Sequence, residues 1–448
     1  MKLKTCLTVA SACLLLSEAA SAEIPLGKVG EWEVYTQGRV NAFLSYITGD
    51  AYPVPPVDEA TGMPIMRPII PGGGLETLAD RIPETDAAGD PIPGRAGSIR
   101  KWRLRSGYFP NILGIGVRSQ VAEELKLSGV LAIWGTIEST GQRKYFPVYA
   151  DFHEAYMKLE GSWGSVTAGR ALSLFSRGIT EVDYLYGHGY GVGYHTNLGD
   201  TGPTGGMIGF GVLAASYNPG FYYTTPSLGG FRINIGLYDP VEYTSSWNRT
   251  ETPRPEVELT YDIETEAFKT HVFANGVYQK LYKDNDARQS ETITGVGGGL
   301  RLEFGPIHIG GGGHYGKGIG LFRALDAEGS LGSTLAGPAN NVDPNTMAEV
   351  GDPNELRTFD GYSVFLQYAP GSFDINLAFG QSRAHLLDID KVLPDSLIKT
   401  QTGISAGFVY HVSKNLHLDV DYLRAMFRWY QGDKQDVNFI NAGATIDW

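Results

Sequence analysis

A regular alternation of long and short connections between strand-like segments most constrains what this chain can fold into. From about residue 30 onward, apolar and polar residues alternate with period two in segments of roughly ten residues, a pattern typical of β-strands. Over 254–263, for example, Val257, Leu259 and Tyr261 alternate with Glu258 and Thr260. We delimit sixteen such segments, at 31–47, 100–118, 126–138, 150–160, 164–170, 212–225, 229–239, 254–263, 267–279, 291–304, 306–315, 359–369, 373–383, 400–411, 416–429 and 436–448.

The connections between these segments are long and short in turn. The long ones are 48–99, 139–149, 171–211, 240–253, 280–290, 316–358, 384–399 and 430–435. The short ones carry turn residues, as in Pro370-Gly371-Ser372. Only antiparallel neighbours joined up and down place every long loop at one end and every tight turn at the other. The sequence therefore predicts an all-β fold, a 16-stranded antiparallel up-and-down transmembrane β-barrel.

Composition agrees with this prediction. The 448 residues contain no run of 18 or more apolar residues, which excludes a bundle of membrane-spanning helices. Only 42% of residues are hydrophobic, as expected where strands expose apolar side chains on one face and the loops are polar. Aromatic residues are expected to form two girdles at the membrane surfaces. Those near the short turns are Trp32, Tyr35, Tyr261, Phe304, Tyr368, Phe373, Phe408, Tyr410 and Trp448, and those near the opposite ends are Tyr46, Tyr278, Tyr315 and Trp429.

The N-terminus has the pattern of a cleaved export signal. Residues 1–22 combine Lys2 and Lys4, a short apolar stretch and an Ala-Ser-Ala cleavage site, which leaves 23–448 as the barrel domain. Both cysteines lie inside the signal, so the mature chain has none. Losing two lysines and Glu18 changes the formal charge from −13 to −14, which argues against nucleic acid as a partner.

The segment 410–422 resembles the penultimate hairpin of the general, trimeric porins of Gram-negative bacteria. Of that family's Tyr-x-Leu-Ser-Lys-x-Thr-x-Leu-Tyr-x-x-Tyr pattern, this chain keeps Tyr410, Ser413, Lys414, Leu418 and Tyr422 but has Val412 for Leu and Leu416 for Thr. Residues 164–170 and 225–231 also resemble the family. The chain ends on Trp448, where most members have the Phe that the barrel-insertion machinery reads.

This resemblance implies a sixteen-stranded barrel in the bacterial outer membrane, usually a homotrimer in contact with lipid and lipopolysaccharide. Such a barrel forms a water-filled channel for passive diffusion of ions and small hydrophilic solutes. It is not an enzyme and has no cofactor. In the family the third external loop folds inward and narrows the pore, and the corresponding segment here is 171–211.

The resemblance also implies a constriction in which acids on the inward loop face a basic ladder on the wall. Carried over by position, the acids are Glu181 and Asp183, and the basic side includes Arg39, Arg118 and Arg170. Alternation independently points Arg39 and Arg118 inward. The alternative is that these arginines sit at strand ends near the headgroups.

Other candidate sites are weaker. His188 and His195 have no carboxylate or thiol at metal-ligand spacing, so no metal site is predicted. The run 310–313 consists of four glycines, which in barrel strands more often mark bends or close subunit packing than a phosphate site. The basic cluster of 100–105 fits a solvated strand mouth or, alternatively, a contact with anionic lipopolysaccharide. We also expect one of the long loops, 48–99 or 316–358, to fold over the pore mouth or a neighbouring subunit.

Three functions remain open at this point. The first is a general diffusion channel, for which the acidic net charge favours a mild preference for cations. The second is a substrate-selective outer-membrane channel for a sugar, a phosphate or an organic anion. The third is a secreted β-rich protein that is soluble after cleavage. A barrel enzyme is disfavoured because no catalytic constellation is evident.

Overall fold

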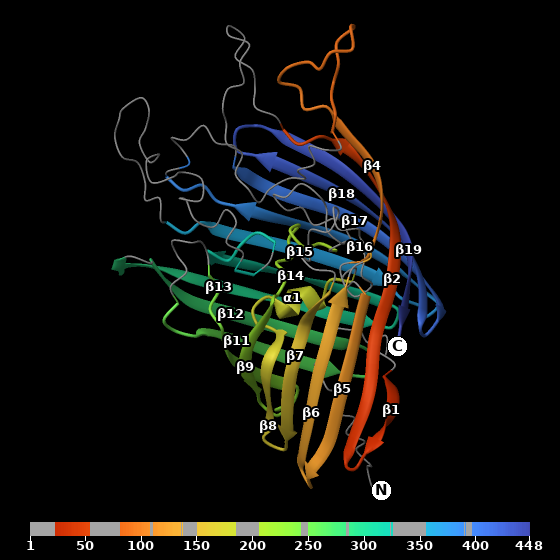
Figure 1. The fold of residues 1–448 in the computed structure, drawn as a ribbon, viewed down its shortest axis with the longest axis vertical. Coiled ribbons are helices and arrows are strands. Elements are labelled where there is room, and N and C mark those ends of the chain that lie inside the picture. The colour runs from red at the N-terminus through yellow and green to blue at the C-terminus, as the bar shows by residue number, and fades with distance from the viewer. Residues whose placement is uncertain are drawn as a thin grey trace.

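The computed structural model is a closed antiparallel β-barrel (Figure 1). The structure describes residues 23–53, 81–107, 111–135, 137, 150–184, 206–242, 250–283, 286–322, 324–325, 355–388, 390 and 397–448. The export signal predicted for 1–22 lies outside these residues. Among the described residues, no helix has both the length and the apolar character needed to span a bilayer.

Nineteen strands make up the sheet. They are β1 (Ile24–Val29), β2 (Trp32–Asp50), β3 (Arg81–Ile82), β4 (Ser98–Arg105), β5 (Asn111–Ala122), β6 (Leu125–Gly135), β7 (Ala150–Gly161), β8 (Gly164–Leu172), β9 (Tyr217–Thr224), β10 (Phe231–Tyr238), β11 (Arg254–Glu264), β12 (Lys269–Lys283), β13 (Asp286–Phe304), β14 (Ile307–Lys317), β15 (Thr358–Tyr368), β16 (Phe373–Ala384), β17 (Ile398–Ser413), β18 (Leu416–Trp429) and β19 (Lys434–Asp447). The one helix among the described residues is α1 (Arg177–Glu181).

These strands occupy sixteen positions around the ring. From β5 to β19 each strand pairs antiparallel with the next, and β19 then pairs with β2, which closes the ring. Both β4 and β5 pair with β2, so they share one position, whereas β1 and β3 are short additions. The prediction of a 16-stranded up-and-down barrel is therefore confirmed.

The shared position of β4 and β5 is a broken strand, where the sequence predicted one strand over 100–118. Pro110 has no backbone N–H to donate to a ladder, which disfavours a continuous strand there. The side chain of Asn41 on β2 spans the break by accepting a hydrogen bond from the Gly107 N–H at 2.9 Å. The Asn41 N–H in turn donates to the Asn111 side chain at 2.8 Å. A second difference is the predicted loop 280–290, most of which belongs to β12 and β13.

The two faces of the wall differ as the alternation predicted. Along β15, Val364 and Leu366 are exposed on the outer face, while Ser363 and Phe365 are buried inside. Several predicted girdle residues are also exposed outside, namely Trp32, Tyr261, Phe304, Tyr368, Phe408 and Tyr410. Two predicted girdle residues are not. Tyr35 and Trp429 are buried, because they follow the inward phase of their strands.

The closure of the ring ends on the C-terminal residue. The Gly38 N–H donates to the Trp448 carbonyl at 2.7 Å, and the Trp448 N–H donates back at 3.0 Å. The Trp448 ring lies over Gly38, since a Cβ at residue 38 would come within 2.6 Å of the ring and 2.5 Å of the Ile112 carbonyl oxygen. Glycine at this position thus lets three strands and the terminal indole meet.

We expect Gly38→Ala to destabilise the barrel by about 1–3 kcal/mol, the typical cost of overpacking. Gly276→Ala is the matched control, because a Cβ there meets its nearest neighbour at an ordinary 3.5 Å and neither glycine has a positive φ. Urea unfolding of both variants in lipid vesicles measures the difference. Equal unfolding midpoints would show that the indole does not need this space.

Candidate functional site

The connection between β8 and β9 enters the barrel. Its described parts, residues 173–184 and 206–216, are here called the inner strap, and α1 lies on it within the ring of strands (Figure 1). Leu174, Phe175, Val182, Met207 and Leu213 on this strap are fully buried. The predicted constriction loop 171–211 corresponds to this segment, although 185–205 lie outside the described residues.

Two carboxylates on β11 hold the first half of the inner strap. Glu256 accepts a hydrogen bond from the Phe175 N–H at 2.8 Å and one from the Arg254 Nε at 2.9 Å. Glu258 forms a salt bridge with Arg177, the first residue of α1. Both carboxylates are almost fully buried, so their charges depend on these partners. Neither acid was predicted as a site residue, although the inward phase of both on β11 was readable from the sequence.

A floor of glycines on β13 and β14 lets α1 approach the wall closely. A Cβ on Gly312 would come within 2.9 Å of Ile179, and one on Gly295 within 2.6 Å of Phe175. On the strap side, a Cβ on Gly178 would collide with the Phe273 ring. The glycines of the 310–313 run that face inward therefore make room for the inner strap, a role that was not predicted from the sequence.

The second half of the inner strap is held by β16 and β17. The Gly211 N–H donates to the Ser382 hydroxyl at 2.8 Å, and the Gln401 side chain donates to the Gly209 carbonyl at 3.0 Å. Phe210 packs against Phe427 of β18, with 5.7 Å between the ring centroids. The inner strap thus crosses from the β11 side to the β17 side along the inner surface.

The two predicted acids have different surroundings. Asp183 is buried, and its carboxylate accepts a hydrogen bond from the Met207 N–H at 2.9 Å, which ties the two halves of the inner strap together. Glu181 keeps 33% of its side chain exposed and lies 3.9 Å from the Arg177 guanidinium. Partial burial of the carboxyl raises the pKa of Glu181, and repulsion from Glu258 adds to this. The Arg177 charge only partly opposes the rise.

The three predicted arginines do not lie together with these acids. Arg39 is buried on β2 and pairs with Asp447 at 2.5 Å, next to the C-terminus. Arg118 lies close to the β5–β6 turn, where it pairs with Glu23 at 2.7 Å and with Glu33 at 2.8 Å. Both arginines are thus at the end of the barrel that carries the short turns.

Arg170 is on the outer face of the wall. It is opposite Ala155 in the β7–β8 register, on the same face as the exposed Met157, and its guanidinium donates to the Phe152 carbonyl at 3.2 Å. The structure therefore does not bring Arg170 to the inner strap. The part that any of these arginines plays in the pore stays a prediction.

A basic row on β4 was missed as a lumen feature. Lys101, Arg103 and Arg105 share the inward phase with Ile99, whereas Arg100 and the exposed Trp102 face outward. Arg105 is fully buried and donates to the Ser45 hydroxyl at 2.9 Å. The signal was present in the sequence, because basic residues at 101, 103 and 105 alternate with Trp102 and Leu104. A contact of the 100–105 cluster with lipopolysaccharide stays a prediction, and of its four basic residues only Arg100 faces outward.

Comparison with known proteins decides the family. The family model described as Gram-negative porin matches residues 7–428 of this chain. The chain belongs to the Gram-negative porin family. No curated protein matches the sequence.

The solved structures that share the fold of this porin include outer-membrane proteins of three bacteria. The outer membrane channel DcaP of Acinetobacter baumannii has a TM-score of 0.60 at 14% identity, over 95% of this chain and 100% of that one. An anion-selective porin from Comamonas acidovorans has a TM-score of 0.56 at 15% identity, over 93% and 100%. In-vitro folded OmpT of Vibrio cholerae has a TM-score of 0.50 at 12% identity, over 95% and 99%. As a member of the Gram-negative porin family, this protein is an outer-membrane channel for passive diffusion.

We expect Gly312→Val to displace the inner strap and change the single-channel conductance. The added side chain would collide with Ile179 and with the Gly298 carbonyl oxygen, which lies 2.6 Å from where a Cβ on residue 312 would be. Gly276→Val on the outer side of β12 is the matched control. Recordings in planar bilayers measure both variants. If Gly312→Val has the same conductance as the unmodified porin, the inner strap does not pack on this part of the wall.

Proposed function

We propose that this porin is a general diffusion channel without catalytic activity, and that the inner strap forms its constriction. The carrying observation is that the strap is fastened to the inner wall at both halves, through Glu258 on β11 and through Ser382 on β16. A fastened segment inside the ring narrows the passage for solutes by a fixed amount. Polar solutes then pass through the part of the lumen that the inner strap leaves open.

We further propose that charge across this passage selects and orients solutes. The acid is Glu181, whose side chain is partly exposed on the strap. The basic side is Arg103, the partly exposed member of the inward row on β4, next to the buried Lys101 and Arg105. Opposite charges on low-dielectric walls produce a field across a narrow passage. In this proposal Glu181 takes the acidic role predicted for the inward loop, and the β4 row takes the basic role predicted for Arg39, Arg118 and Arg170.

The basic row also favours a second candidate, a channel selective for an organic anion or phosphate. The two candidates differ in how solutes affect the ion current. A selective site gives a saturable block of the current by one class of solute, whereas a general channel gives none. Titration of the current with sugars, phosphate and dicarboxylates separates them.

We propose a homotrimer, as is usual for the family. A support within the chain is a patch of small residues on the outer side of the closure, where Ala42 of β2 is opposite Ala444 of β19 and Ala442 is opposite Leu44. Small side chains allow a second barrel to approach closely. Contacts with lipopolysaccharide and with the insertion machinery through Trp448 complete the proposed partners.

On acidification, any preference of the channel for cations should begin to fall at a higher pH than the titration of an ordinary glutamate would give. Because burial raises the pKa of Glu181, its negative charge is lost on acidification earlier than that of an exposed glutamate. The reversal potential in a salt gradient, followed from pH 8 to pH 4, measures this change. Glu181→Gln should remove the part of this change that occurs at the higher pH. Glu264→Gln should not, because Glu264 is the last residue of β11 and its side chain is 71% exposed. An unchanged pH profile in Glu181→Gln would refute the role of Glu181.

Ala42→Trp should weaken the trimer and leave the channel conductive, because the bulky side chain blocks close approach without touching the lumen. Ala274→Trp is the control, since Ala274 is also exposed on the outer face but on β12. Chemical crosslinking and light scattering in detergent give the number of subunits. A trimer of unchanged stability in Ala42→Trp would place the interface elsewhere.

A further inference from the structure

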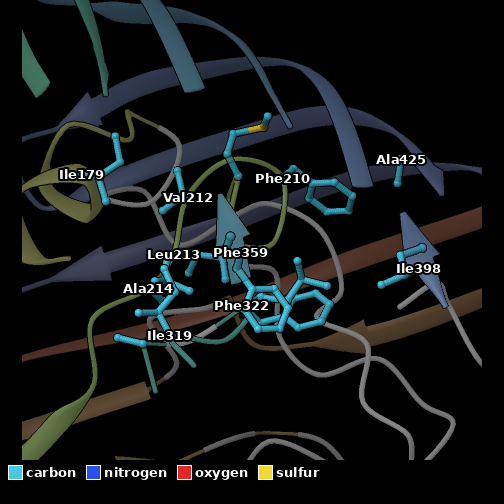
Figure 2. Close-up of a cluster of buried hydrophobic side chains, with 14 of the residues drawn as sticks. Ile179, Phe210, Val212, Leu213, Ala214, Ile319, Phe322, Phe359, Ile398 and Ala425 are labelled. Carbon is cyan, nitrogen blue, oxygen red and sulfur yellow. The ribbon is translucent and has the colours of Figure 1, made fainter. Parts of the chain in front are cut away.

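A second external connection also enters the barrel. The described residues 318–322 and 324–325, here called the second segment, follow β14 and begin the long connection to β15. Ile319 is fully buried, and Leu321 and Phe322 are each 4% exposed. Figure 2 shows Ile319 and Phe322 among side chains of the inner strap such as Leu213 and Ala214. The base of loop 316–358 therefore packs inside the barrel.

The second segment is joined to the inner strap by backbone hydrogen bonds. The Ala214 N–H donates to the Phe322 carbonyl at 2.8 Å, and the Ala324 N–H donates to the Ala214 carbonyl at 2.8 Å. The Phe322 ring lies directly on Gly209, where a Cβ would collide with the ring. Gly209 has a φ of +79°, a conformation that other residues rarely adopt. A glycine at position 209 thus allows the Phe322 ring to pack directly on the strap backbone.

A buried clamp fixes the start of the second segment. The Gly318 N–H donates to the Arg357 carbonyl at 2.7 Å, and the Arg357 guanidinium binds both oxygens of Asp390, at 2.6 and 3.0 Å. Arg357 is fully buried and Asp390 is 5% exposed. Asp390 also accepts a hydrogen bond from the Leu387 N–H at 2.6 Å. Two-point binding of this kind fixes orientation as well as position.

We propose that the second segment sets the pore size by positioning the inner strap, with Phe322 and the Arg357–Asp390 clamp as the positioning residues. This inference rests on the proposed role of the inner strap as the constriction. The second half of the inner strap is held by the wall on one side, through Ser382 and Gln401, and by the second segment on the other. Solutes cannot pass between two surfaces packed this closely, so the passage lies on the remaining side of the strap.

It follows that the base of the β14–β15 connection and the constriction should move together. Loss of the Phe322 ring leaves a cavity beside Gly209, and the strap then has room to move into the space that the ring occupied. Loss of the clamp releases the start of the second segment. Either change should widen the passage, because both remove the support that keeps the strap in the lumen.

The first test compares Phe322→Ala, Phe322→Leu and the control Phe379→Ala in planar bilayers. Phe379 is an outward residue of β16 with 37% exposure, so its loss removes a similar volume outside the lumen. We expect Phe322→Ala to shift the size limit for neutral polymers entering the pore to larger molecules and to raise the conductance. Phe322→Leu should restore both values toward those of the unmodified porin, and Phe379→Ala should change neither.

The second test removes the charge of the clamp with Asp390→Asn and uses Asp360→Asn as its control. Asp360 also pairs with an arginine, Arg383, but Arg383 is 49% exposed on the outer side of the wall. Only Asp390→Asn should shift the polymer size limit. The heat-dependent gel mobility of each variant reports whether the barrel has folded, and if Asp390→Asn does not fold, the Phe322 series decides.

The outcomes separate this inference from the proposal on which it rests. If Gly312→Val alters the conductance while Phe322→Ala and Asp390→Asn both behave like their controls, the inner strap is a constriction and the second segment does not position it. If none of the three variants alters the channel, both proposals fall. A larger size limit in Phe322→Ala that Phe322→Leu reverses supports the inference.

Discussion

The pairing of β19 with β2 is the constraint on which the rest of the molecule depends. A bilayer offers no water to backbone groups, so a membrane-spanning sheet is stable only when it has no free edge. Here the first and last long strands meet over eleven residue pairs, from Val437 with Gly49 to Asp447 with Arg39. The ladder is completed by the reciprocal hydrogen bonds of Gly38 with Trp448. The closed wall then fixes which side chains face inward.

A closed wall of this size leaves an interior that its own side chains do not fill. The inner strap and the second segment both enter it, and each needs its own attachment because an inserted loop loses conformational freedom. The inner strap is attached through buried carboxylates on β11 and amide and hydroxyl groups on β16 and β17. The second segment is attached through the Arg357–Asp390 pair. A buried ion pair of this kind contributes little net stability, because the cost of removing both charges from water offsets their attraction.

The wall was predictable from the sequence, while most of the interior was not. Alternation along a strand such as β11 fixes its faces, and turn residues fix the ends of hairpins such as β15–β16. Tyr35 and Trp429 were misassigned because their aromatic type was weighed more heavily than their inward phase. Arg177 could not be placed from sequence, since its partner Glu258 is 81 residues away and only the closed ring brings them together. The same holds for Gly312 and Ile179.

The polarity of the inward residues along a single strand indicates where loops pack against that strand. On β18 the inward residues begin as His417, Asp419 and Asp421 near the short turn, and continue as Leu423, Ala425, Phe427 and Trp429 toward the other end. A water-filled lumen explains the polar half but not the apolar half, because apolar groups facing water would be unfavourable. The apolar half is explained by Phe210 of the inner strap, which packs on Phe427, and by Tyr52, which packs on Trp429. A change from polar to apolar residues in the inward phase of a barrel strand is therefore a sequence signal for inserted loops.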